Sequence, residues 1–417
     1  MKNFLLKLRS DKAHYLFFAV SISFFIFLNF WKIKYGFKGW DESFYITIPH
    51  RILQGDALFK DEWHLSQLSG FLRIPFVWIY ELVTKSTEGI VLFIRVCYVV
   101  FHAVVSVFAY IRLRKYGYVA AVSMLLYFIF TPFDIMALSY NTMGMDFLVV
   151  TGVTMATADT SKKLPFILSG ISFSAVVLCC PFMALVYVLF AFGVLSNKIF
   201  VEKKRSKIIC RIFIIVMGLC VPNIASFIFT YLLAAEIYKE SNPKKIVKSL
   251  KIIVISLFVF YTCFQGLLET YVKIYHCYGE DGNTLTLNYM IDKGPAKGIY
   301  TNEENYNHYN ALYDDVVVHN NHEGKKVLFV TKSTWTYLAA YKTRNAALSG
   351  WLWLNFYDEC FERMRDYYSV NEDKIPDYIY IEKSTFNLSD KASLFDELEK
   401  NGYEMTENDI SYMFAKK

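Results

Sequence analysis

Charged residues are scarce in this chain, and the motifs of nucleotide-binding proteins are missing. Asp, Glu, Lys and Arg make up 20% of the 417 residues, against about 25% in a typical soluble protein. The net charge of +6 is too small to indicate nucleic-acid binding. No glycine-rich phosphate loop is present, which argues against a nucleotide-sugar enzyme or an ATPase. Nine prolines and a mean hydropathy of +0.29 argue against a disordered chain.

Cysteine spacing gives no sign of a metal site or of a disulfide framework. The chain has eight cysteines, but no CxxC pair and no Cys/His spacing typical of zinc ligands. Most of them lie in apolar segments, where cysteine behaves as a small hydrophobic residue. The spacing alone does not decide whether Cys277 and Cys360 pair.

Apolar and aromatic residues are abundant instead, at 55% and 18% of the chain. Long apolar runs alternate with short polar clusters up to about Tyr271, whereas no later run approaches the roughly 20 residues that a spanning helix requires. We therefore predict a multi-span α-helical membrane protein, with a transmembrane bundle at 1–272 and a soluble α/β domain at 273–417. The expected spans are 15–30, 89–113, 118–138, 144–158, 164–179, 181–195, 208–234 and 250–271.

Basic residues set the expected orientation in the cytoplasmic membrane. Lysines and an arginine before the first span place the N-terminus inside, so the loop at 34–70 lies outside. Four lysines between Lys239 and Lys248 hold their loop inside and place the C-terminal domain outside, although simple alternation of the spans would place it inside. In that domain, 327–331 and 378–381 read as buried strands, with helical patterns between and after them. The C-terminal domain could either bind the acceptor or cap the bundle, and the sequence leaves both roles open.

The segment most suggestive of chemistry follows the first span. Asp41 and Glu42 precede an aromatic residue, Tyr45, and a short amphipathic helix that ends at Gly55. Acidic residues are common in the first turn of any helix, because they complement its dipole. Their place just outside a membrane span favours a functional reading, in which the helix lies on the membrane surface and holds both carboxylates at the boundary between lipid and water.

This arrangement resembles the first extracytoplasmic loop of GT-C glycosyltransferases that use polyprenyl-phosphate sugars, such as the protein O-mannosyltransferases and the lipid A aminoarabinose transferases. Their pattern is an Asp-Glu pair after the first span, an aromatic residue, a surface helix ending in Gly, then an aromatic residue and an Asp. The likeness covers roughly residues 1–195. The matching positions in this sequence are Asp41, Glu42, Tyr45, Gly55, Phe59 and Asp61.

The resemblance implies a GT-C-like bundle and transfer of a sugar to an extracytoplasmic glycan, lipid or protein. It implies that Asp41 is the general base and that Glu42 either positions it or shares a divalent metal ion with it. Membrane lipids are the other expected partner, and the active site faces outward. Residues expected to contact the substrate are Tyr45, Arg51, Lys60, Asp61, Arg73, Arg95 and Asn141.

Cations near a lipid phosphate would stabilise the charge of the leaving group. Arg51, Lys60 and Arg73 are the nearest in sequence to the acidic pair, and each could equally be a surface or headgroup-contacting charge. Arg95 lies within an expected span, where an arginine is costly without a partner. That partner is either the lipid phosphate or one of two carboxylates, Asp134 and Asp146.

The alternative function is a non-enzymatic membrane protein, either a transporter or a scaffold that keeps the same architecture. A transporter is expected to show paired charges or broken helices at mid-membrane, together with internal repeats. The sequence has few such charges and no repeat, so we favour the enzyme.

Overall fold

The computed structural model describes residues 12–37, 39–159, 161–185, 188, 264, 268, 271, 276–277, 279–318, 322–351, 360–385 and 391–417. The chain divides into two compact units: a helical unit from 1–32 and 98–276, and a mixed unit from 33–97 and 277–417. The boundary between 97 and 98 lies inside helix α5, which therefore contributes residues to both units.

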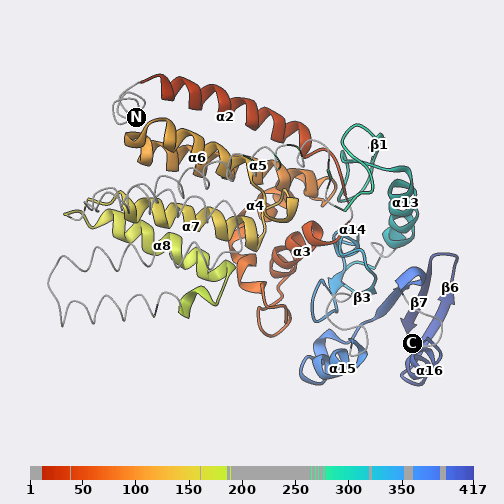
Figure 1. Cartoon of the computed structure of the whole chain (residues 1–417). Coiled ribbons are helices and arrows are strands. Elements are labelled where there is room, and N and C mark those ends of the chain that lie inside the picture. The colour runs from red at the N-terminus through yellow and green to blue at the C-terminus, as the bar shows by residue number, and fades with distance from the viewer. Residues whose placement is uncertain are drawn as a thin grey trace, which may run out of the picture. The chain divides into compact units, whose positions relative to one another are not determined.

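The helical unit consists of apolar helices joined by short turns. Helix α2 packs against α6, and α7 packs against α8 (Figure 1). A capping box starts α7, since Ser139 and Thr142 each accept the backbone N–H of the other. The described elements are α2 (Ala13–Lys32), the later part of α5 (Ile90–Leu113), η2 (Arg114–Tyr116), α6 (Tyr118–Ile129), η3 (Pro132–Asp134), α7 (Tyr140–Ala156) and α8 (Leu164–Cys179).

A buried polar cluster ties three of these helices together. His102 of α5 lies with its Nδ1 2.6 Å from Oδ1 of Asp146 on α7, and Tyr127 of α6 donates its hydroxyl hydrogen to the same oxygen. His102 and Asp146 are 1% and 0% exposed. Asp146 therefore pairs with a histidine and a tyrosine of its own unit, and not with Arg95 as one expectation had it.

The prediction of a multi-span GT-C-like bundle is wrong for the described residues. In this part of the chain two helices are long and apolar enough to cross a membrane, namely α2 and the stretch Ile90–Tyr116. The expected span 118–138 is broken, because α6 ends at Ile129 and Phe133 has a positive φ of 56° within the turn that follows. Twelve helical residues rise about 18 Å, which is short of a hydrocarbon core of about 30 Å.

The other expected spans are either shorter than a membrane-crossing helix or lie wholly or mostly outside the described residues. Helix α8 coincides with the expected span 164–179 but has only 16 residues. Expected span 208–234 lies outside the described residues, as do most of 181–195 and 250–271.

The mixed unit is built around a five-stranded sheet with strand order β4-β3-β5-β7-β6. Strand β3 is parallel to both β4 and β5, whereas β7 is antiparallel to β5 and to β6. The strands predicted at 327–331 and 378–381 are β3 and β5, and both are almost entirely buried. The strands of this sheet are β3 (Lys326–Val330), β4 (Arg344–Asn345), β5 (Tyr378–Glu382), β6 (Tyr403–Glu407) and β7 (Ser411–Lys416).

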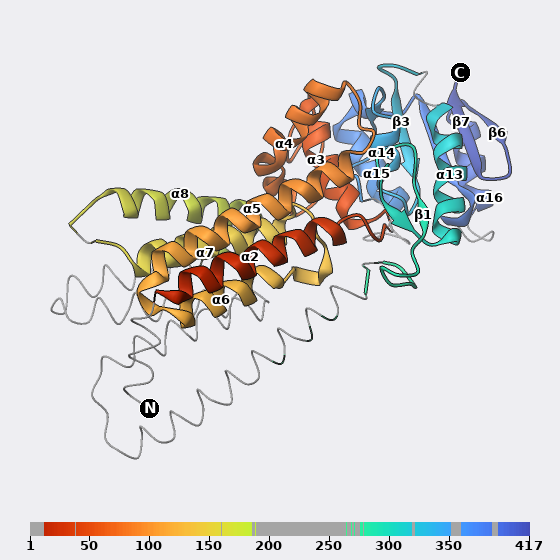
Figure 2. The same ribbon diagram turned by 90° about the horizontal axis from the view of Figure 1, so that it is seen from above.

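Helices cover both faces of this sheet, as Figure 2 shows for α13 and α16. On one face Tyr380 donates a hydrogen bond to Asp315 of α13 (2.6 Å). On the other face Phe395 of α16 packs against Phe414, whose strand partner Ile379 is the neighbour of Tyr380 and so points to the opposite side. The remaining elements are α3 (Asp41–Leu53), η1 (Gln67–Ser69), α4 (Gly70–Thr84), the start of α5, β1 (Tyr289–Met290), β2 (Tyr300–Thr301), α13 (Glu303–Val317), α14 (Thr336–Ala339), α15 (Cys360–Val370), η5 (Glu372–Lys374), η6 (Lys383–Thr385) and α16 (Lys391–Lys400).

The segment 33–97 belongs to this unit, which differs from the expectation that the loop 34–70 is part of the membrane bundle. Backbone hydrogen bonds join Tyr300 N to Lys34 O (2.7 Å) and Gly36 N to Tyr300 O (2.8 Å). The buried carboxylate of Glu280 accepts hydrogen bonds from Phe37 N (2.8 Å) and from Thr301 Oγ1 (2.5 Å). Hydrogen bonds thus hold the loop against residues more than 200 positions later in the chain.

Candidate active site at the start of helix α3

Asp41 and Glu42 form the first turn of α3, as the sequence predicts. The residue before them, Trp40, caps the helix without a side-chain hydrogen bond, so the two carboxylates complement the positive end of the helix dipole. Neighbouring positions on an α-helix project about 100° apart, and the two side chains therefore meet different surroundings.

Glu42 is locked in a buried ion pair with Arg95. Arg95 Nε lies 3.0 Å from Glu42 Oε1, and Nη2 lies 2.5 Å from Oε2. The same guanidinium donates to the carbonyl oxygens of Ile33 and Gly36, both at 2.6 Å. Because Glu42 and Arg95 are only 5% and 3% exposed, this pair fixes the start of α3 against the segment that leads into it.

This geometry corrects the expected partner of Arg95. The donors of Arg95 are taken by Glu42 and by backbone carbonyls of its own unit, where a lipid phosphate or the carboxylate of Asp134 or Asp146 was expected. Both oxygens of Glu42 accept hydrogen bonds from Arg95, so Glu42 already has a cationic partner, and a metal ion shared with Asp41 stays a prediction. Of the two roles open to Glu42, the positioning of Asp41 agrees with this arrangement.

Asp41 is more accessible than Glu42 and is electrostatically distinct. Burial, and secondarily the charge of Glu42, raise the pKa of Asp41 from 3.8 to about 6. A carboxylate with such a pKa is ionised at neutral pH and still basic enough to accept a proton. Asp41 therefore keeps the chemical properties that the predicted role of general base requires.

The turn before Asp41 is held at the carboxyl end of strand β3. The backbone N and Oγ1 of Thr334 both lie 3.1 Å from Gly39 O, and Oγ1 also donates to Trp40 O (2.5 Å). Gly39 has a φ of +77°, and a Cβ atom there would lie 2.5 Å from Cδ1 of Trp335. In open α/β sheets ligands bind beyond the carboxyl ends of the strands, and this contact places Asp41 at that edge.

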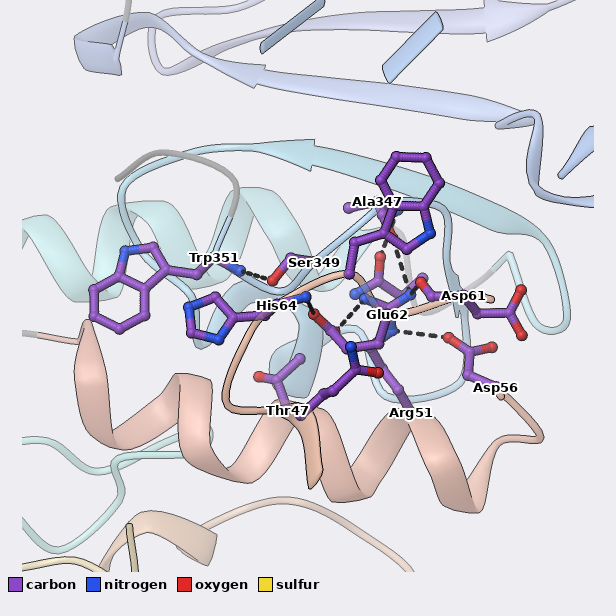
Figure 3. A network of polar contacts seen from close by, with 12 residues as sticks. Thr47, Arg51, Asp56, Asp61, Glu62, His64, Ala347, Ser349 and Trp351 are labelled. Atoms are coloured by element: carbon purple, nitrogen blue, oxygen red, sulfur yellow. Dashed lines mark hydrogen bonds and ion pairs between the residues drawn. The ribbon is translucent and has the colours of Figure 1, made fainter. Parts of the chain in front are cut away.

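Arg51 belongs to a buried network that fastens α3 to the sheet (Figure 3). It donates to Asp56 Oδ2 (2.8 Å), Glu62 Oε2 (2.7 Å), Asp61 O (2.6 Å) and Ala347 O (2.9 Å). Burial alone would lower the pKa of Arg51, but the charges of Glu62 and Asp56 raise it above its ordinary value. With 1% of its surface exposed, Arg51 is a structural residue, and its predicted contact with a substrate phosphate is not supported.

Two more of the expected substrate-binding residues are buried beneath the surface. The guanidinium of Arg73, on α4, lies 5.4 Å from the centre of the Tyr45 ring and donates to Ser69 Oγ (2.9 Å). Arg73 and Tyr45 are 1% and 2% exposed. They join α3 to α4 through a cation–π contact.

The other expected contacts are divided between the two units. Asp61 is 4% exposed, and its Oδ2 accepts a hydrogen bond from Ala57 N (2.7 Å), so it stabilises its own turn. Lys60 is 56% exposed and has its Nζ 3.6 Å from Asp373 Oδ1. Asn141 is the second residue of α7 and belongs to the helical unit, whereas Asp41 belongs to the mixed unit.

An aromatic cluster beside α3 was not identified as part of the site from the sequence. Phe44 contacts both His64 and Trp351, at ring-centre distances of 4.6 and 4.8 Å, and the His64 and Trp351 rings are nearly parallel. Burial, followed by the charge of Arg73, lowers the pKa of His64 to about 4, so His64 is neutral at physiological pH. Trp351 is almost 290 residues from His64 in the chain, and no local sequence pattern could have joined them.

Within the part of the chain that the structure describes, no group of three or more His, Cys, Asp or Glu side chains is arranged to hold a metal ion. Comparison with known proteins adds no relative: no protein-family model, no curated protein and no solved structure matches this chain.

Proposed function

We propose that this chain is a membrane-anchored glycosyltransferase that moves a sugar from a polyprenyl-phosphate donor to an extracytoplasmic acceptor, with Asp41 as the general base. The observation that carries the proposal is the contrast within the acidic pair. Glu42 is ion-paired with Arg95 and held in place by it, whereas Asp41 stays partly accessible with a pKa raised to about 6.

Sugar transfer to a hydroxyl group requires one carboxylate that can accept a proton. An acceptor hydroxyl is a weak nucleophile, and a base must remove its proton as the oxygen attacks the anomeric carbon. Asp41 Oδ takes that proton, the new glycosidic bond forms, and the bond to the lipid phosphate breaks with its electrons on the phosphate. The ion pair behind Asp41 keeps the base in place without competing for the proton.

Attachment to a membrane suits a donor with a lipid tail. Helices α2 and α5 have the length and composition of membrane-crossing segments, and we propose that they anchor the chain. Asp41 follows the end of α2 by nine residues, a stretch that reaches at most about 30 Å when extended. The base is then within reach of a phosphate at the membrane surface, and we propose that Lys60, whose side chain is 56% exposed, is the cation that meets this phosphate.

The test is the Asp41→Asn variant of the full chain in proteoliposomes, supplied with a panel of synthetic polyprenyl-phosphate sugars. We expect release of polyprenyl phosphate to fall by about 10²–10⁴-fold, the usual contribution of a general base. Asp314→Asn removes an exposed carboxylate of the same unit (65% exposed) and should leave the rate unchanged.

The pH dependence of the wild-type rate is a second readout. Because Asp41 must be ionised to accept a proton, the rate should fall about tenfold per pH unit below an apparent pKa near 6. Near wild-type turnover by Asp41→Asn, or an acid limb that stays unchanged in that variant, would contradict the assignment.

A further inference from the structure

Helix α4 carries an exposed stripe made only of apolar residues. Its members recur at the spacing of one helix face. Trp78 is 51% exposed, Leu82 49% and Val83 77%, and no charged side chain interrupts the stripe. The stripe consists of Phe71, Pro75, Trp78, Ile79, Leu82 and Val83.

The opposite face of α4 is packed against α3. A Cβ atom on Gly70 would lie 2.6 Å from Cγ2 of Ile48, which shows how closely the two helices approach. Val77 is completely buried, and Arg73 faces Tyr45. The stripe is therefore the outer surface of a well-packed helix and not an unfolded edge.

Several observations indicate a lipid bilayer as the partner of this stripe. A helix of 15 residues is about 22 Å long, too short to cross a hydrocarbon core of about 30 Å, but suited to lie along its surface. A tryptophan lies in the middle of the stripe, and tryptophan favours the interface between lipid and water.

The contacts between α4 and α5 also favour a lipid bilayer as the partner of the stripe. Five residues link α4 to α5, which has the length and composition of a membrane span. The Tyr80 ring at the end of α4 lies 4.8 Å from the Phe93 ring near the start of α5, and the Tyr80 hydroxyl donates to Glu88 O. The end of α4 is thus held beside the beginning of a helix that is itself suited to lipid.

We propose that α4 lies in the plane of the membrane surface, with the stripe from Phe71 to Val83 inserted among the lipids. Packed helices lie about 8–10 Å apart, so α3 then rests one helix layer above the lipid surface. The further consequence, that Asp41 is held at the height of a lipid phosphate, rests on the proposed function. The membrane contact itself does not.

The experiment uses the full chain in nanodiscs of phosphatidylcholine and phosphatidylglycerol, with or without bromine on the acyl chains. Bromine quenches tryptophan fluorescence on contact. Wild type should lose more fluorescence than Trp78→Phe, and the difference reports Trp78 alone. Trp335→Phe is the matched control, because Trp335 is 2% exposed within the mixed unit and its removal should leave the quenched amplitude unchanged.

A second pair of variants tests the whole stripe. Leu82→Asp places a charge on α4, whereas Val318→Asp places one on a similarly exposed apolar residue just after α13 (55% exposed). We expect Leu82→Asp to reduce the quenching of Trp78 and Val318→Asp to leave it unchanged. Equal quenching of wild type and Trp78→Phe would overturn the proposal, whether water, a second copy or another segment of the chain covers the stripe. Loss of transfer in Asp41→Asn with no quenching of Trp78 would leave the enzyme proposal standing and reject the membrane contact.

Discussion

Replacing Arg95 with leucine tests the arrangement from which the proposed mechanism starts. The change removes both hydrogen bonds to Glu42 and those to the carbonyl oxygens of Ile33 and Gly36. The Glu42 carboxylate, 5% exposed, would then be buried without a counter-charge. Breaking a buried ion pair from one side costs about 3–5 kcal/mol, and we expect a loss of stability of that size.

Two further variants separate the energy of the interaction between Glu42 and Arg95 from the contribution of each residue alone. Glu42→Leu leaves Arg95 with its carbonyl partners but without its carboxylate, and should also destabilise the protein. The double variant Glu42→Leu/Arg95→Leu replaces a buried ion pair by apolar side chains, which is often close to neutral. The carbonyl oxygens of Ile33 and Gly36 still lose a donor, at about 1–3 kcal/mol for each one that water does not reach. The double variant should therefore cost about 2 kcal/mol less than the sum of the single variants.

Thermal unfolding of the full chain in detergent measures these differences. For a unit of about 200 residues, 1 kcal/mol corresponds to roughly 2–4 °C in Tm, so Arg95→Leu should lower Tm by roughly 10 °C. A Tm that stays the same or rises in Arg95→Leu would refute the reasoning, since it would show that Glu42 does not depend on Arg95. Additive single-variant costs would refute the direct coupling of the two residues.

Three further variants test the frame around the site. Arg51→Met should lower stability by about 3–5 kcal/mol, measured as Tm, because it strands the buried carboxylates of the network in Figure 3. Gly39→Ala should lower transfer activity and Tm more than Gly55→Ala, since both glycines have a positive φ but only a Cβ at Gly39 meets another side chain. Asp41→Asn should gain stability relative to wild type as pH rises from about 4 to about 6, followed as Tm at each pH. The folded wild type holds the Asp41 proton up to about pH 6 while the unfolded chain releases it near 3.8, so the stability from that protonated carboxyl is lost as pH rises through this range.

Local features of the sequence predicted local structure well. The acidic pair begins a helix, α3, that ends at Leu53, and Gly55 follows it with a φ of +101°. The apolar runs at 327–331 and 378–381 are strands of one sheet. In each case the signal is contained within a few residues, in helix-favouring ends or in a run of β-branched and aromatic side chains.

The apolar run at 118–138 misled the topology because hydropathy does not register a change of backbone conformation. Its composition suits a spanning helix, yet the chain leaves the helix after Ile129 and turns at Pro132 and Phe133. Proline was the available warning, because it disfavours helical conformation in the residue before it. An apolar helix of 12 residues can instead bury its surface against its neighbours, as α6 does against α2.

Partners distant in the sequence could not be predicted at all. Arg95 and Glu42 are 53 positions apart, and Arg51 reaches Ala347 across 296 positions. Arg51 was expected to contact the phosphate because it is close in sequence to the acidic pair, and Arg95 because an arginine within an apolar span needs a partner. Only the fold shows that the acceptors come from the chain itself.

Asp41 and Glu42 have different roles because Glu42 is paired with an arginine from a distant part of the sequence. Two adjacent carboxylates at a helix start repel each other, and their charges cannot both be buried cheaply. Here one of them, Glu42, is paired with Arg95 and so remains a fixed charge next to Asp41. That charge adds to the effect of burial and raises the pKa of Asp41 to about 6. The Arg95 pair fixes the start of α3 and so stabilises the fold, and in the proposed mechanism it also holds Asp41 in place to accept a proton.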